Sequence, residues 1–593
     1  MILVALSLVW IAQRGFGDSS DFELAPNEPP PTSEAGPGVA LDQSTADPVQ
    51  PIDYRVGLLG SPSTDNFWAY YGREATVWNA YVLGATKPAL YALEPGANQL
   101  TADLATTPIA EPQQDDGKWK VTLELGAGAK WSDGRPITSG DFLFTFETVR
   151  ELGLQGGWET AYPGNLQAVE ASDERTLTLV FDQRPVLAEW PYGVGLAPVM
   201  PSHVWQEVAD DADRPKALYD VSGDDDVSGG PLAIVAWEKG SITAAAHRTR
   251  GRDLASVTFE IYGDETSAVT AMASAEIDTL LSPGGLTPDG ETMLEGWDDI
   301  AIETSPANSI RYLGFNLHRE PMSEPAFRQA LALLFDRAGT ADEVVPGAKP
   351  AYSLIPPANE AWYDDEEWQS LAAPFDRKLN WRLAKALKGL RDTGYTWAEK
   401  PKVVEGELIA GTGLAIDGLE PAPLTILTSG DKHDPARPEY ASRIEATLEI
   451  LGFDVRPVET DFDTVVDLAF TPRDEGPRTY DMYLLGWTLG NPALPNFYEE
   501  FFVENGAINS TGYTRGGFDE AWEAYRGAAT HSEAVAALWD MERMLANDLP
   551  YLPLYHPTLV EAYRSDRVQF GLSEVLGGLH SRLGGIGDLS PVQ

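Results

Sequence analysis

Few residue patterns in this 593-residue sequence could perform catalysis. Its seven histidines form no H-E-x-x-H zinc motif, and neither a G-x-S-x-G nucleophile elbow nor a G-x-x-x-x-G-K-[ST] phosphate loop occurs. The Gly117-Lys118 pair is followed by Trp119 and so lacks the hydroxyl that would hold magnesium. The absence of cysteine excludes thiolate nucleophiles, zinc-thiolate sites and disulfides. We therefore expect a protein that is not an enzyme and that needs no cofactor.

One acidic stretch imitates part of a metal site. Asp224 to Gly229 follows the opening D-x-D-x-S-G of a calcium loop. The twelfth position of such a loop needs a bidentate glutamate, and here it is Val235. We expect an acidic surface loop at this place and no metal site in the chain.

A glycine–tryptophan pair is the best candidate for binding chemistry. Gly486-Trp487 follows the apolar run 482–485 and precedes Asn491-Pro492, so the pair lies where a strand ends and a loop begins. An indole offers a large apolar surface at small entropic cost together with one N–H donor. Since the chain has 17 tryptophans, the alternative is an ordinary core position.

The elements that must position these residues alternate along the chain. Helical spacing and strand-like alternation follow one another, which favours an α/β architecture. We expect strands at 119–125 and 176–181, a helix at 139–151 capped by Ser139, and further helices at 325–335, 380–390, 438–451 and 532–546. Two more apolar strand candidates, 311–316 and 551–555, bracket about 240 residues. One lobe could therefore be inserted into another.

Charge and composition restrict the partners. The 42 Lys and Arg residues face 91 Asp and Glu residues, which gives a formal net charge of −49. Because Lys and Arg occur singly or in pairs, we expect no nucleic-acid partner. A hydrophobic fraction of 43% is ample for a packed core.

The first 50 residues differ from the rest. Residues 1–16 begin with an apolar run that is too short to span a bilayer, and we interpret them as the remnant of a signal or anchor segment. Residues 17–50 are rich in Pro, Ser and acidic residues and fit an extended tether. We expect an exported protein, periplasmic or at the cell surface, that touches a membrane only through this segment. The alternative is a frayed apolar terminus.

Beyond residue 50, several segments together resemble the extracellular solute-binding proteins, family 5, of ABC importers, which include oligopeptide, dipeptide and nickel binders. The resemblance rests on order and spacing, since no single motif is specific. The similar segments are Gly128–Phe142, Gly229–Leu232, Ala275–Asp278, Leu313–Asn316, Phe327–Leu331 with Asp336-Arg337, Tyr480–Trp487 and Leu549–Tyr555.

The resemblance implies a two-lobed periplasmic-binding-protein fold of type II that closes around its ligand. Lobe I would comprise 51–311 and 554–593, with an extra subdomain at about 75–200, and lobe II would comprise 312–553. Two strands would form the hinge between them. The implied hinge residues are Phe315, Asn316, Pro553 and Leu554.

The resemblance also implies where the ligand binds. Many peptide binders of this family carry an aspartate three residues after the tryptophan, where it pairs with the α-ammonium of the ligand. Here that position is Gly490, which would disfavour a ligand whose buried ammonium needs a countercharge. The implied ligand-binding residues are Gly486, Trp487, Gly490, Asn491, Trp68, Tyr70, Asn509, Tyr513 and Arg311. Core positions are the alternative for the aromatic members, and an ordinary ion pair is the alternative for Arg311.

These observations predict the substrate-binding subunit of an ABC importer. It would be a monomer that captures peptide-like solutes and delivers them to permease and ATPase subunits. The abundant tryptophan and Gly490 also fit an oligosaccharide or another polar solute. A surface hydrolase and a ligand sensor are more remote alternatives.

Overall fold

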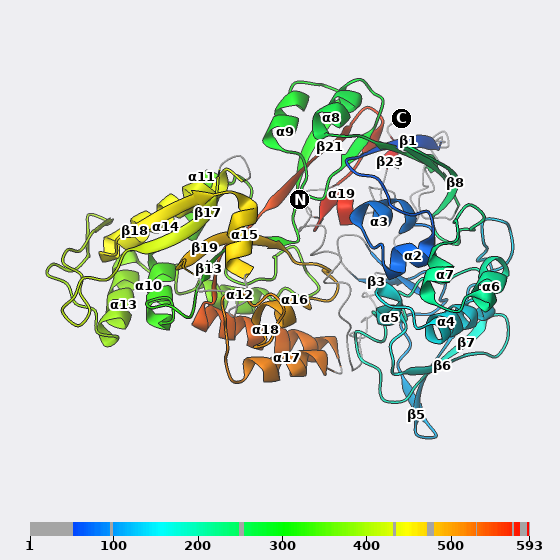
Figure 1. Ribbon diagram of the computed structural model, residues 1–593, viewed down its shortest axis with the longest axis horizontal. Coiled ribbons are helices and arrows are strands. Elements are labelled where there is room, and N and C mark those ends of the chain that lie inside the picture. Colours follow the sequence, from blue (N-terminus) through cyan, green and yellow to red (C-terminus); the bar gives the residue numbers. More distant parts are fainter. Residues whose placement is uncertain are drawn as a thin grey trace, which may run out of the picture.

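The computed structural model describes residues 51–94, 99–247, 254–430, 434–470, 479–528, 530–571, 575–581 and 590–591. The expected anchor and tether, 1–16 and 17–50, lie outside the described residues. Among the helices of the described ranges, none is long and apolar enough to cross a bilayer. Two bodies lie side by side, each built on a large mixed sheet (Figure 1).

The first body contains a seven-stranded sheet, coloured blue, green and red in Figure 1. Its strand order is β12-β21-β11-β1-β10-β9-β8, and β1 runs parallel to both β10 and β11. The strands are β1 (Ile52–Leu58), β8 (Leu232–Glu238), β9 (Ser241–Ala246), β10 (Leu254–Ile261), β11 (Thr279–Leu281), β12 (Ile300–Pro306) and β21 (Thr558–Arg564).

An additional subdomain is inserted between β1 and β8. Its four-stranded sheet has the order β4-β5-β7-β6, with β4 (Gln113–Asp115), β5 (Lys118–Glu124), β6 (Leu166–Ala171) and β7 (Thr176–Phe181). The core around this sheet extends from Phe67 to Tyr219 and is rich in tryptophan. The insertion is therefore somewhat longer than the expected range of 75–200.

The second body contains a six-stranded sheet with the order β14-β20-β13-β19-β17-β18. Here β17 is parallel to β18 and β19, whereas β13 is antiparallel to β19 and β20. The strands are β13 (Ser309–Phe315), β14 (Lys349–Pro350), β17 (Leu424–Ser429), β18 (Val455–Thr460), β19 (Met482–Thr488) and β20 (Tyr551–His556).

Helices and short strand pairs complete each body. In the first body the helices are α2 (Phe67–Gly72), α3 (Val77–Leu83), α4 (Ser139–Leu152), α5 (Gly157–Ala161), α6 (Ser202–Asp211), α7 (Pro215–Tyr219), α8 (Glu265–Ala273), α9 (Pro288–Leu294) and α19 (Gly578–Ser581). In the second they are α10 (Pro325–Leu334), α11 (Arg337–Val344), α12 (Asp365–Ala372), α13 (Leu379–Asp392), α14 (Ala436–Leu451), α15 (Phe462–Phe470), α16 (Phe497–Phe502), α17 (Phe518–Arg526) and α18 (His531–Asp548). The short pairs are β2 (Tyr91–Leu93) with β3 (Leu100–Ala102), β15 (Lys402–Val404) with β16 (Glu407–Ile409), and β22 (Val568–Gln569) with β23 (Ser590–Pro591).

The chain passes twice between the two large sheets. The first crossing is Ala307-Asn308, between β12 and β13, and the second is Pro557, between β20 and β21. His556 ties the two crossings together, because its Nδ1 lies 3.1 Å from the carbonyl oxygen of Ser309. Burial lowers the pKa of this histidine to about 4, so the imidazole is neutral at pH 7.

The expected hinge residues lie beyond these crossings. Phe315 ends β13, Asn316 follows it, and Pro553 and Leu554 lie within β20, all in the second body. The ladder between β13 and β19 already begins at Ser309, which pairs with Thr488. The chain therefore changes sheets at 307–308 and at 557 and not near 311 and 553.

The expected helices and strands are present with small shifts at their ends. The helix expected from Ser139 is α4, but its N-cap is Thr138 and not Ser139. The carboxylate of Asp141 accepts the backbone N–H of Thr138 at 2.9 Å, which closes a capping box. The Ser139 hydroxyl bonds instead to the carbonyl of Asp173.

One buried acid of the second body gives a pH-dependent stability. Burial raises the pKa of Glu542 in α18 to about 7, and hydrogen bonds from the Tyr498 hydroxyl and the Leu354 N–H offset part of that rise. An unfolded glutamate titrates near 4.5, so between about pH 4.5 and 7 the folded chain holds a proton that the unfolded chain has lost.

We predict that Glu542 makes the free energy of unfolding fall as the pH rises through this window, by on the order of 3 kcal/mol. Urea unfolding of the full chain between pH 4 and 8 measures the slope. Glu542→Gln should flatten this part of the curve, whereas Glu520→Gln, at an exposed site, should not. Equal slopes in both variants and the parent would contradict the assignment.

Candidate functional site

The carboxyl ends of the parallel strands in the two bodies point toward each other. In the second body β17 and β19 end at Ser429 and Thr488, and β13 begins beside Thr488 just after the first crossing. In the first body β12 runs into that crossing, and β11, β1 and β10 run in the same direction as β12. Ligands of open α/β sheets bind outside the carboxyl ends of their strands. The space between these two edges is therefore the candidate site.

Gly486 and Arg311 form the middle of the second-body edge. They face each other in the β13–β19 ladder. A Cβ at position 486 would stand 2.5 Å from Arg311 Cδ and 2.9 Å from the carbonyl oxygen of Ile310. The glycine is required here because the arginine side chain lies across its strand.

Arg311 also takes part in a small charged cluster. Its Nε lies 3.5 Å from the carboxylate of Asp434, just before α14, and Arg437 Nε lies 3.2 Å from the same oxygen. Arg437 Nη1 donates to Ser429 Oγ at 3.0 Å, at the end of β17. Burial lowers the pKa of Arg437, Asp434 opposes this change, and Arg311 adds to it. Among the described residues of this cluster, two arginines share one carboxylate, in a strongly acidic protein.

Trp487 lies beside this cluster at the end of β19. One face of the indole stacks on Phe501, with ring centroids 4.8 Å apart, and Phe470 meets it edge-on at 5.5 Å. The residue is half-buried, and its Nε1 is buried without a hydrogen-bond partner of normal geometry. The indole is thus packed between aromatic rings at the edge of the sheet, and its N–H points into the protein near Tyr551.

The loop after Trp487 is bonded to the first crossing. Asn308 Nδ2 donates to the carbonyl oxygen of Gly490 at 3.0 Å, and the backbone N–H of Leu489 donates to the carbonyl of Asn308 at 2.9 Å. Gly490 has φ +69°, a region that glycine enters without strain. Asn491 is exposed, and its Oδ1 accepts the N–H of Ala493. Both residues therefore shape the loop next to the crossing.

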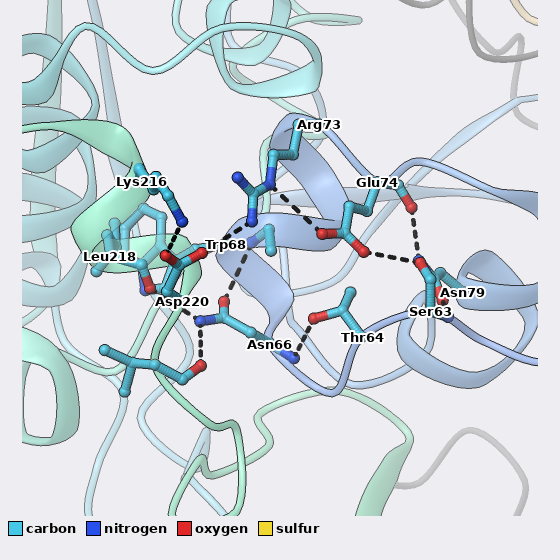
Figure 2. A network of polar contacts seen from close by, with 12 residues as sticks. Ser63, Thr64, Asn66, Trp68, Arg73, Glu74, Asn79, Lys216, Leu218 and Asp220 are labelled. Atoms are coloured by element: carbon cyan, nitrogen blue, oxygen red, sulfur yellow. Dashed lines mark hydrogen bonds and ion pairs between the residues drawn. The ribbon is translucent and has the colours of Figure 1, made fainter.

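Two expected site residues lie in the first body, in or against its core. Trp68 is fully buried and packs on Trp158 with centroids 4.6 Å apart, and Tyr70 contacts Phe67 edge-on at 5.2 Å. The segment is fixed by Asn66, whose Oδ1 accepts from Ala69 and whose Nδ2 donates to the carbonyl of Leu218. Figure 2 shows Asn66 at the centre of this polar network, between the Arg73–Asp220 ion pair and Ser63. Trp68 is a core residue of the subdomain.

The other expected pair stabilises a loop of the second body. Asn509 Oδ1 accepts the N–H groups of Gly512 and Tyr513, each at 3.0 Å, and its Nδ2 donates to the carbonyls of Val503 and Tyr513. Tyr513 is buried and donates its hydroxyl hydrogen to Asp548 at 2.8 Å. The polar groups of both side chains are used within the protein, which leaves them a structural role.

The sequence of this chain also matches a known protein family. Residues 99–509 match the family described as bacterial extracellular solute-binding proteins, family 5, middle. The chain belongs to this family. That match covers well over half of its length, and it confirms the expected solute-binding component of an ABC importer.

Individual relatives are distant, but they cover most of this solute-binding protein. The oligopeptide-binding protein OppA of Bacillus subtilis (strain 168) is 23% identical over 469 residues, which cover 75% of this chain and 77% of OppA. Among solved structures, AppA from Bacillus subtilis in complex with a nonapeptide is 19% identical, with a TM-score of 0.57 over 92% of this chain and 100% of AppA. The periplasmic EDTA-binding protein EppA is 18% identical, with a TM-score of 0.66 over 92% of this chain and 97% of EppA. These likenesses confirm the two-lobed α/β fold.

Sequence reasoning missed three residues of this site. Asp434 and Arg437 are spaced i, i+3 at the start of a helix that follows a parallel strand. The Asp434-Pro435 pair, which is typical of the start of a turn or helix, was the sequence signal that could have located them. Asn308 lies in a crossing whose position depended on the strand register, and nothing local in the sequence marked it.

The close approach of Arg311 to Gly486 can be tested by substitution of the glycine. Gly486→Ala should push Arg311 away from Asp434 and lower ligand affinity at least tenfold, because the new Cβ meets both backbone and side-chain atoms. Gly516→Ala is the matched control, since a Cβ there meets no atom within 4 Å. Affinity is measured by calorimetry and the position of Arg311 by crystallography. Unchanged affinity with Arg311 in place would contradict the packing described.

Proposed function

We propose that this solute-binding protein captures a peptide-like solute between the two facing strand edges and delivers it to a membrane permease. The observation that carries the proposal is the placement of Trp487, with Gly486 and Arg311, at the carboxyl edge that faces the first body. A stacked indole and the backbone groups around a glycine suit the alternating side chains and amides of an extended peptide. OppA and AppA, whose names and titles refer to oligopeptides, support this ligand class.

The charged cluster beside Trp487 favours a carboxylate on the ligand. Arg311 and Arg437 share Asp434, and Arg311 is 29% exposed whereas Arg437 is 8% exposed. Arg311 is therefore the cation that a ligand can reach. A guanidinium presents donors that match the two oxygens of a carboxylate. We assign Arg311 the role of receiving the carboxyl group of the solute.

Gly490 shapes selectivity at the other end of the ligand. It offers no countercharge for an ammonium group, and its carbonyl already accepts a hydrogen bond from Asn308. A buried ammonium without a partner would be costly. The site therefore fits a solute whose ammonium stays in water or is absent.

Closure of the lobes would use the crossings at 307–308 and 557. Each crossing is one or two residues long and separates strands of different sheets, which is where a hinge absorbs backbone change. The bonds between Asn308 and the 489–490 segment would transmit the hinge position to the loop after Trp487. We further propose that the protein is exported and held near the membrane through residues 1–50, and that it acts as a monomer.

Native mass spectrometry of the purified full chain tests the ligand class. A heterogeneous ladder of co-purified masses separated by amino-acid residues is expected. A hexose-spaced or single non-peptide adduct would overturn the peptide proposal and would favour the oligosaccharide or other polar-solute alternative. Turnover of the bound species into fragments would instead indicate a hydrolase.

Replacing the indole tests the binding surface. Trp487→Ala should weaken binding of a mixture of synthetic peptides of two to nine residues by at least tenfold, because the stacking surface is lost. Trp381→Ala is the matched control, since Trp381 is exposed on α13. Equal affinities of the two variants would contradict a role for Trp487.

The role of Arg311 has its own test. We expect the parent protein to prefer peptides with a free carboxyl terminus over C-terminally amidated ones by about tenfold or more, and Arg311→Gln to abolish this preference. A preference that survives the substitution would contradict the assignment. Calorimetric titration of paired free and amidated peptides measures both.

A further inference from the structure

A cavity opens in the second body, apart from the facing edges. It has a volume of about 290 Å³, is open to solvent on one side, and is lined by α12, α18, the start of β20 and the segment after β14. Its walls include Tyr352, Phe375 and Phe502, together with Leu354, Leu371 and Leu545. A bound water occupies about 30 Å³, so the cavity has room for an organic molecule of several carbon atoms. The α12 and α18 helices lie at the lower side of this body in Figure 1.

One wall of this cavity carries a buried cation. Arg337, at the start of α11, is 3% exposed and lines the cavity. Its Nη1 donates to the carbonyl oxygens of Ala351 at 2.9 Å and Pro553 at 3.3 Å. Its Nε and Nη2, which form the other edge of the guanidinium plane, have no hydrogen-bond partner in the described part of the chain. That edge is the one that can donate two parallel hydrogen bonds to a carboxylate.

In the described part of the chain, no acid is paired with Arg337. Within the described ranges no Asp or Glu forms an ion pair with it, and its guanidinium carbon lies 4.0 Å from the ring centre of Phe375 and 4.5 Å from that of Tyr352. Burial lowers its pKa to about 10, opposed by Tyr352. Aromatic rings stabilise a cation but do not neutralise it, and buried charges are normally paired.

The acid that lines this cavity does not neutralise Arg337. Glu542 lines the same cavity, but its carboxylate accepts the N–H of Leu354, at 3.2 Å and 3.1 Å to its two oxygens, and the hydroxyl hydrogen of Tyr498. No contact joins it to Arg337 in the described chain. A cation with an unused bidentate edge thus remains beside a cavity of mixed lining, in which Ser370, Arg543 and Asn547 accompany the aromatic and aliphatic side chains.

We propose that this cavity is a second binding site, for a small organic carboxylate whose carboxyl group pairs with Arg337 and whose apolar body packs on Tyr352, Phe375 and the leucines. Two parallel N–H···O bonds satisfy the free edge of the guanidinium and neutralise the buried charge. The aromatic and aliphatic part of the wall favours a ligand with an apolar body over a fully polar anion. The site is separate from the peptide site, so its occupancy does not depend on the proposed transport function.

Calorimetric titration of the full chain with sodium benzoate tests the proposal, with inorganic phosphate as the comparison anion. We expect saturable binding of one benzoate per chain and at least tenfold weaker binding of phosphate. Ala546→Phe fills the cavity from α18 without removing Arg337, and it should weaken benzoate binding at least tenfold. Ala384→Phe, on the exposed side of α13, is the matched control and should bind as the parent does.

Arg337→Gln should weaken benzoate binding to the same degree. Ala546→Phe keeps the test valid if the arginine variant fails to fold. Absence of saturable benzoate binding to the parent would overturn the proposal. So would unchanged affinity in Ala546→Phe, which would place benzoate elsewhere. Phosphate bound as tightly as benzoate and displaced by it would overturn the ligand class.

Discussion

The two crossings between the large sheets are the constraint on which the rest of the structure depends. Because the chain passes from β12 to β13 and from β20 to β21 within one or two residues, the strand edges beside the crossings must face each other. The parallel strands of both bodies happen to end at these edges, so backbone groups and loop residues converge there. The hydrogen bond from Asn308 to Gly490 then couples a crossing directly to the loop that follows Trp487. In the proposed function, this hydrogen bond would link solute binding to lobe movement through adjacent residues.

The local charge at the polar sites of the second body differs in sign from the net charge of the chain. The chain as a whole carries a net charge of −49, yet the polar sites of the second body are built around arginines. Arg311 and Arg437 share the carboxylate of Asp434, and Arg337 pairs with no carboxylate among the residues that the structure describes. A local positive charge favours binding of anionic groups at those places. The negatively charged surface elsewhere repels them. Both proposed ligands, at the edge and in the cavity, are carboxylates for this reason.

The sequence predicted the architecture better than the site. Alternation and helical spacing located most helices and strands, because these patterns follow from burial of one face of each element. The order of weak motifs predicted the family correctly. Trp68 could not be assigned from the sequence, because a buried tryptophan and an exposed one have the same local pattern. Asp434 and the cavity around Arg337 depend on contacts between segments far apart in the chain, and such contacts leave no local signal. The crossing at Asn308 was displaced from its expected place because the strand register is a tertiary property.

Closure of the two bodies around a solute can be measured directly, because the sequence contains no cysteine that would compete for labelling. Spin labels at Thr292→Cys in α9 and Asp463→Cys in α15 place one probe on each body at exposed positions. Pulsed electron paramagnetic resonance then gives the distribution of distances between the two labels, with and without the peptide mixture. We predict that the peptides shift the distribution to one shorter, narrower distance, and that Trp487→Ala removes the shift at the same peptide concentration. A distribution that stays unchanged while calorimetry shows peptide binding would contradict closure around the ligand.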